Sequence, residues 1–104
     1  MPLYYARRIY TEEGMLMAVI ADEEAMNRAG IDEERGTRII VSSEFYGSTL
    51  VDEKEAVNLM MEADILVLTG SRIIEKAISM GLVHPDSVIE VKGLRHVQVF
   101  KFSY

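Results

Sequence analysis

The chain has 104 residues, of which 49% are hydrophobic and 27% charged, and its formal net charge is −6 at pH 7. This length predicts a single domain spanning residues 1–104, and the composition excludes a disordered chain. The chain has no cysteine. Disulfides, thiolate catalysis and cysteine-bound metal centres are therefore excluded, and a reducing compartment is expected.

Hydropathy and charge narrow the class of protein further. No stretch approaches the roughly 18 apolar residues that span a bilayer, and Arg7 and Arg8 follow the apolar start of the chain, the reverse of a signal peptide. We therefore expect a cytoplasmic protein without a membrane segment. The negative charge opposes general binding to nucleic acid or anionic membranes. A local basic face would need the two terminal strands, which carry Arg7, Arg8, Arg95 and Lys101, to be neighbours.

The first elements are predicted to form a hairpin. Residues 3–10 and 15–21 have strand-like composition, and the four residues between them end in Gly14, which tolerates positive φ. Apolar residues occupy both sides of the second strand, as in a central strand. A short helix should follow, with Asp22 as its N-cap and Gly30 just past its end.

The middle of the chain predicts alternating strands and helices. Residues 38–42 read as a strand, and Asp52 with Glu55 has the spacing that opens a helix, here reaching about residue 63. Residues 65–68 form a short apolar run typical of a buried strand. A further helix then begins near Ser71 and ends at Gly81.

The last elements are strands at 88–91 and 97–102, joined around Gly93, after a turn at Pro85. Strands outnumber helices, and hairpins open and close the chain. The predicted fold class is α+β: a single-domain two-layer sandwich with a mixed, mostly antiparallel sheet and two to three helices.

The turn at Thr69-Gly70-Ser71 is one candidate site. A turn between a buried strand and a helix offers free backbone N–H groups to a phosphate, and Arg72 would add positive charge. The full glycine-rich phosphate-binding spacing is absent. The alternative is an ordinary tight turn with Ser71 as the helix N-cap.

Signals for a metal or for catalysis are weak. His84, His96 and Asp86 have no recognised metal-ligand spacing, so we expect no metal and no cofactor. No Gly-x-Ser-x-Gly motif occurs, and no base lies beside a hydroxyl in the sequence. An enzyme remains open but is less favoured than a binding protein.

Phe45-Tyr46-Gly47 places two adjacent aromatic residues in a predicted turn. Both rings cannot point into one strand face, so one of them should be exposed, as aromatic residues at ligand or protein contacts are. We expect Phe45 to anchor the core and Tyr46 to cover the end of the sheet. The segment Gly93-Leu94-Arg95-His96-Val97-Gln98 places two polar side chains, His96 and Gln98, on one side of a strand.

The order of these motifs resembles a family of small archaeal proteins known as domain of unknown function 424. The resembling segments are Phe45-Tyr46-Gly47 with the acidic helix after it, 63–70, Ile74-Glu75-Lys76-Ala77 with Gly81-Leu82-Val83, 88–91 and 93–98. The family's last segment has proline and alanine where this chain has Arg95 and Val97, and the family has asparagine at Val67. If that asparagine and that proline carry an activity, this member has lost or altered it. The resemblance implies an archaeal protein of unknown function, with an association with translation or the ribosome.

These observations favour an interaction module without enzymatic activity, which binds a protein or ribonucleoprotein partner. The alternative is a protein or enzyme that binds a small anion or phosphate at residues 69–72. A homodimer remains open. The candidate binding residues are Phe45, Tyr46, Gly47, Gly70, Ser71, Arg72, Arg95, His96 and Gln98.

Overall fold

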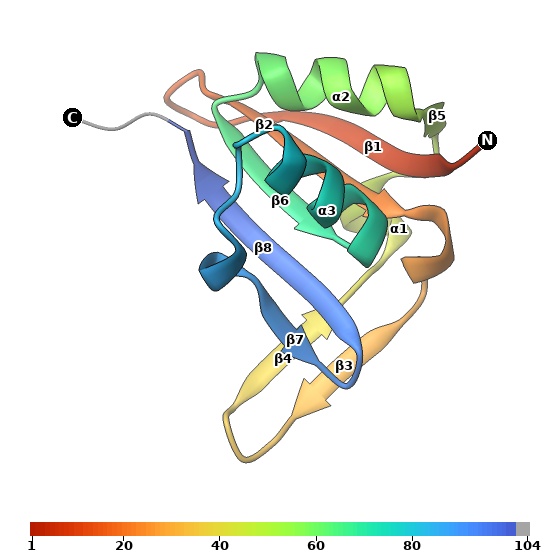
Figure 1. Ribbon diagram of the computed structural model, residues 1–104, viewed down its shortest axis with the longest axis vertical. Coiled ribbons are helices and arrows are strands. Elements are labelled where there is room, and N and C mark those ends of the chain that lie inside the picture. The colour runs from red at the N-terminus through yellow and green to blue at the C-terminus, as the bar shows by residue number, and fades with distance from the viewer. Residues whose placement is uncertain (102–104) are drawn as a thin grey trace.

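The structure is a computed structural model that describes residues 1–101, and Figure 1 shows its strands and helices packed together in one α+β domain. The strands are β1 Leu3–Tyr10, β2 Leu16–Asp22, β3 Ala29–Asp32, β4 Thr37–Ile40, β5 Leu50–Asp52, β6 Ile65–Thr69, β7 Ile89–Val91 and β8 Leu94–Phe100. The helices are α1 Ser43–Tyr46, α2 Glu53–Glu62 and α3 Ser71–Ser79, and the 3-10 turns are η1 Glu23–Ala25 and η2 Pro85–Ser87.

The main sheet has the strand order β5-β1-β2-β6-β8-β7. Its central pair, β2 and β6, is parallel, and the other pairs are antiparallel. The α+β class and the mixed, mostly antiparallel sheet are therefore confirmed. Strands β3 and β4 form a separate hairpin.

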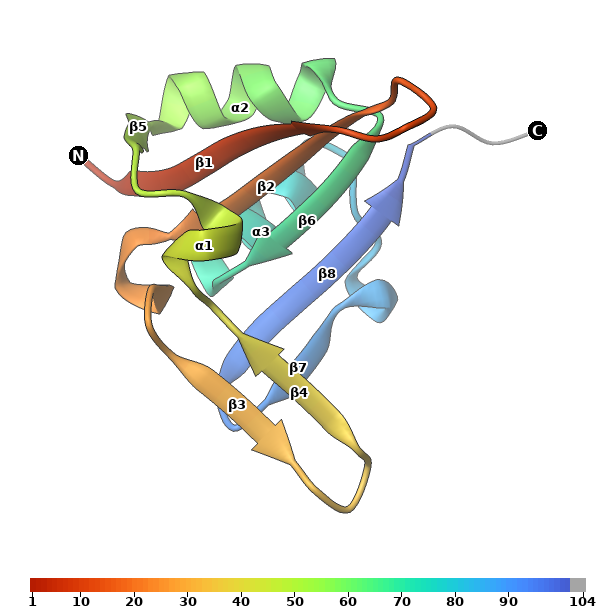
Figure 2. The ribbon, with the colours of Figure 1, turned by 180° about the vertical axis from the view of Figure 1, so that it is seen from behind.

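The two faces of the main sheet are covered differently. Leu66 and Leu68 of β6 belong to the core beneath α2 and α3, whereas Val67 lies in a second cluster on the opposite face. Figure 2 shows that α1 and the β3–β4 hairpin lie on this second side. Since side chains alternate along a strand, Thr69 also faces the second side.

Local sequence signals account for several elements. The predicted first hairpin is confirmed, and Gly14 has φ 83° in its turn. The doubly apolar β2 is central, as expected. The side chain of Asp52 accepts a hydrogen bond from the Glu55 N–H, which confirms the predicted cap of α2.

The predicted helix between Asp22 and Gly30 is wrong. The chain makes only the η1 turn and then enters β3, which contains Gly30. The Asp22 side chain does not cap this turn. A Cβ at Gly30 would overlap the backbone carbonyl oxygen of Val91, so this glycine is needed where β3 crosses β7.

The terminal strands also differ from expectation. Strand β8 begins at Leu94, three residues earlier than predicted, and the predicted end at Phe102 lies outside the described residues. Strands β1 and β8 are separated by β2 and β6. The condition for a shared basic face on the terminal strands is therefore not met. Among residues 1–101, no helix is long and apolar enough to cross a membrane.

Candidate functional site

A chain of hydrogen bonds joins three elements on the second face of the sheet. The Tyr46 hydroxyl of α1 lies 2.6 Å from Thr69 Oγ1 at the end of β6. Thr69 Oγ1 lies 2.7 Å from His96 Nδ1 on β8. Because Thr69 and His96 are cross-strand partners, the sheet register brings their side chains together.

The donors and acceptors in this chain have one arrangement that uses every proton. Tyr46 donates to Thr69, Thr69 donates to His96 Nδ1, and the imidazole carries its proton on Nε2. His96 Nε2 lies 3.3 Å from the Gln98 side-chain amide. With the amide oxygen turned toward the ring, Nε2–H donates to Gln98. The buried hydroxyls therefore orient the imidazole and direct its Nε2 edge outward.

Solvent exposure increases along this series of hydrogen-bonded groups, from Thr69 and Tyr46 to Gln98. Thr69 is 0% exposed and Tyr46 is 2% exposed, whereas His96 is half-buried and Gln98 is exposed. Burial raises the pKa of Tyr46, and the hydrogen bond with Thr69 opposes that rise. Burial lowers the pKa of His96, so the imidazole is neutral at pH 7, as the proton arrangement requires.

The outer end of this network opens on a mixed surface. His96, Gln98 and Phe100 alternate along one side of β8, and Ile89 is the cross-strand partner of His96 on β7. Phe100 is 61% exposed and Ile89 is 44% exposed. We call these four residues the His96 surface.

The roles expected for the two adjacent aromatics are reversed. Tyr46 is the core anchor, and Phe45 is 41% exposed. Their rings meet edge to face at 5.3 Å. Gly47 ends α1 with φ 79°, a conformation that glycine adopts at little cost. Tyr46 therefore supports the site from beneath and does not belong to its surface.

Arg95 lies on the opposite face from His96, because neighbouring residues of a strand alternate. Its guanidinium is 3.1 Å from the Glu75 carboxylate of α3. The candidate binding residues Tyr46, Arg95, His96 and Gln98 are thus divided between the two faces and the core.

The turn at residues 69–72 holds an internal carboxylate. The Asp22 side chain accepts from the Arg72 N–H at 2.8 Å and from the Ile73 N–H at 2.9 Å. Burial raises the pKa of Asp22, and the hydrogen bonds from these two amides oppose the rise. An external phosphate would have to displace Asp22 from the seat predicted for an anion.

The neighbours of Asp22 explain the rest of this turn. Gly70 has φ 116°, and a Cβ there would overlap the Asp22 carboxyl group. Gly70, and not Ser71, is the N-cap of α3. The Arg72 guanidinium pairs with Glu24, donates to the Leu3 carbonyl at 3.0 Å and lies 5.2 Å from the centre of the Tyr4 ring. Arg72 therefore ties α3 to β1.

Sequence reasoning missed the central roles of Thr69 and Asp22. The available signal was a polar residue at the carboxyl end of each of two apolar strands, which become parallel neighbours. In the described part of the chain, no three histidine, aspartate or glutamate side chains gather as metal ligands. His84 instead accepts from the Asp86 N–H within its own turn.

Comparison with known proteins agrees with this architecture. Residues 10–102 match the model of a protein family of unknown function, DUF424. The chain belongs to this family. A crystal structure of an uncharacterized conserved protein from Methanopyrus kandleri is similar, with a TM-score of 0.73 and 16% sequence identity, over 98% of this chain and 94% of that one. At this identity the likeness shows a shared fold. A search of the curated proteins gave no match.

Proposed function

We propose that this DUF424 domain is a non-enzymatic interaction module that binds a protein partner through the His96 surface. One observation carries the proposal: two buried hydroxyls orient the imidazole of His96, yet its Nε2 edge ends at a surface with exposed apolar side chains. A fixed donor beside apolar side chains is the composition of a protein contact, in which polar groups set orientation and apolar groups supply area.

The hydroxyls of the network do not favour a nucleophile. Thr69 is fully buried, and its oxygen lies between Tyr46 and His96. A catalytic hydroxyl would have to reach a substrate. The network is better suited to holding His96 in one orientation for binding.

The acidic chain favours a partner with a basic surface, because opposite charge speeds encounter. Ribosomal proteins are such partners, and the family resemblance suggests the translation machinery. We therefore propose a protein component of that machinery as the partner.

Affinity capture with matched variants tests this function. Wild type, Gln98→Arg and Ser79→Arg are immobilised and exposed to extract of the source organism. Gln98 lies on the His96 surface and Ser79 lies on α3 at the other face, and both are exposed. We expect wild type and Ser79→Arg to retain the same ribosome-associated protein and Gln98→Arg to lose it. Equal retention by Gln98→Arg, or no specific partner, would refute the proposal.

A further inference from the structure

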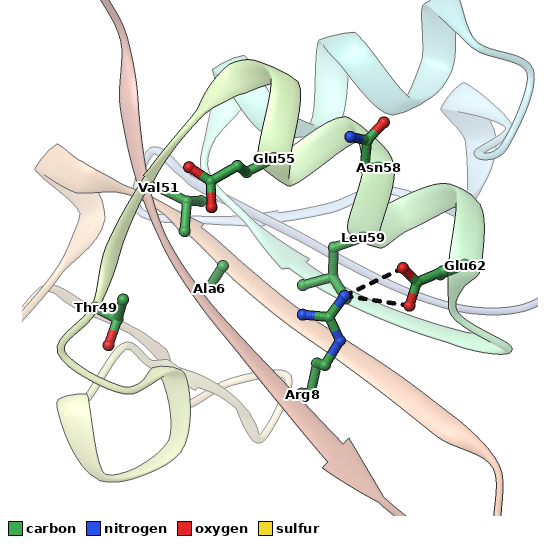
Figure 3. A pocket seen from close by; sticks show the side chains of 8 residues that line it. All are labelled: Ala6, Arg8, Thr49, Val51, Glu55, Asn58, Leu59 and Glu62. Carbon is green, nitrogen blue, oxygen red and sulfur yellow. Dashed lines mark hydrogen bonds and ion pairs between the residues drawn. The ribbon is translucent and has the colours of Figure 1, made fainter.

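A groove lies on the opposite side of the molecule from the His96 surface, between β1 and α2. Its volume is about 450 Å³, and its lining includes Ala6 and Arg8 of β1 with Glu55, Leu59 and Glu62 of α2. Figure 3 shows the Arg8 and Leu59 side chains side by side in it, with the Arg8 guanidinium joined to Glu62.

The β1 strand borders this groove with an open edge. Strand β5 pairs with β1 at Leu3, Tyr4 and Tyr5, and the Ala6 N–H donates to the Thr49 carbonyl. The chain then leaves the edge, with Gly47 packed against Arg7 and α1 beyond it on the other face. In the described residues no strand pairs with β1 along this edge past Ala6.

The direction of the β1 backbone follows from two hydrogen bonds. The Thr11 N–H points toward the β2 side and donates to the carbonyl of Met15, the residue just before β2, and the Ala6 N–H points toward Thr49 on the outer edge. Main-chain groups alternate between the two edges of a strand. Arg8 and Tyr10 therefore turn their N–H and C=O groups outward, in line with Ala6, and offer an unpaired ladder to an extended segment.

The lining sets the chemistry of the occupant. A residue paired with Arg8 would place its side chain on the α2 side of the sheet, over Leu59 and Ala6. The Arg8 guanidinium is already neutralised by Glu62 at 3.2 Å. The Glu55 carboxylate has no ion-pair partner among residues 1–101. The groove thus joins an apolar floor to one uncompensated negative charge, which suits the alkyl stem and cationic head of lysine or arginine.

We propose that the β1–α2 groove binds an extended peptide segment of a partner protein by strand addition. The segment continues the line of β5 antiparallel to β1, and its basic side chain packs on Leu59 and reaches Glu55. Main-chain bonds with Arg8 and Tyr10 supply the affinity, and the pocket supplies the specificity. This site is independent of the His96 surface, so either proposal can fail alone.

The test selects short random peptides, displayed on phage, on the full chain. The best peptide is synthesised and titrated while the amide NMR signals of the protein are followed. We expect selected sequences to carry a lysine or arginine, and the shifted amides to be those of Arg8, Tyr10 and the groove side of α2. The same peptide N-methylated on the backbone at the paired positions should not bind, because it lacks the ladder donors.

Two matched variants sharpen the result. Glu55→Lys should weaken the basic peptide about tenfold, and a peptide with glutamate at the basic position should bind this variant better than wild type. Glu33→Lys makes the same charge change in the exposed turn between β3 and β4 and should leave affinity unchanged. Each of three results would overturn the proposal: no peptide enriched on wild type, equal binding of the N-methylated peptide, or concentration-dependent β1 shifts without peptide, which mark a second copy as occupant.

Discussion

Replacing Asp22 with alanine should destabilise the domain far more than the loss of an ordinary helix cap. The Asp22 carboxylate accepts from the amides of Arg72 and Ile73, and Ile73 is fully buried. Losing a cap costs about 1 kcal/mol, and leaving a buried N–H without an acceptor adds about 2 kcal/mol. The free energy of unfolding should therefore fall by about 3 kcal/mol, and Tm by about 15 °C in a domain of this size.

The matched control is Asp52→Ala. Asp52 accepts from one amide, that of Glu55, at the exposed start of α2. Its loss should cost about 1 kcal/mol. Asp22→Asn keeps one acceptor oxygen for two donors and should fall between the two alanine variants. Urea unfolding followed by circular dichroism measures all three. Equal losses for Asp22→Ala and Asp52→Ala would refute the assignment of Asp22 as the buried acceptor for the first amides of α3.

Three further predictions concern the network and the β3–β4 hairpin. Tyr46→Phe leaves Thr69 one partner and should lower the free energy of unfolding by about 1 kcal/mol in urea titrations. Gly30→Ala forces a methyl group against Val91 and should lower the free energy of unfolding by about 2 kcal/mol in the same titrations. An unchanged free energy of unfolding would contradict the contact between Gly30 and Val91. Burial lowers the pKa of His96 in the folded protein. As the pH falls, this imidazole is therefore protonated in the unfolded chain before it is protonated in the folded one. The contribution of His96 to stability should therefore be constant above about pH 7, decline below about pH 6.5 by at most 1.36 kcal/mol per pH unit, and level off below the folded pKa. This decline should vanish in His96→Asn.

The sequence predicted an element correctly where the hydrogen bonds that define it join residues only a few positions apart. Asp52 and Glu55 are three positions apart, so the start of α2 could be read from the sequence. The two-sided apolarity of β2 likewise predicted a central strand, since both of its faces are covered.

Prediction from the sequence failed where a residue's contact partner is distant along the chain. Asp22-Glu23-Glu24 has the composition of a helix start, but the Asp22 carboxylate is used 50 residues later by Arg72. Gly30 resembled a helix end, and its reason is the crossing of β7. The choice between Phe45 and Tyr46 as the core ring depends on the Thr69 hydroxyl, which forms a hydrogen bond with the Tyr46 hydroxyl. A local pattern carries none of these long-range contacts.

The parallel pairing of β2 and β6 explains why the polar residues at this end of the sheet are structural. Parallel strands place their carboxyl ends at one edge, where open α/β sheets bind ligands. Here the Asp22 carboxylate occupies the first amides of α3, while Thr69 beside it holds Tyr46 and His96. The polar groups that a partner could still contact are those that face solvent. On the second face that group is His96 Nε2, and on the helix side it is the backbone of Arg8; the two proposed binding surfaces are built on these groups.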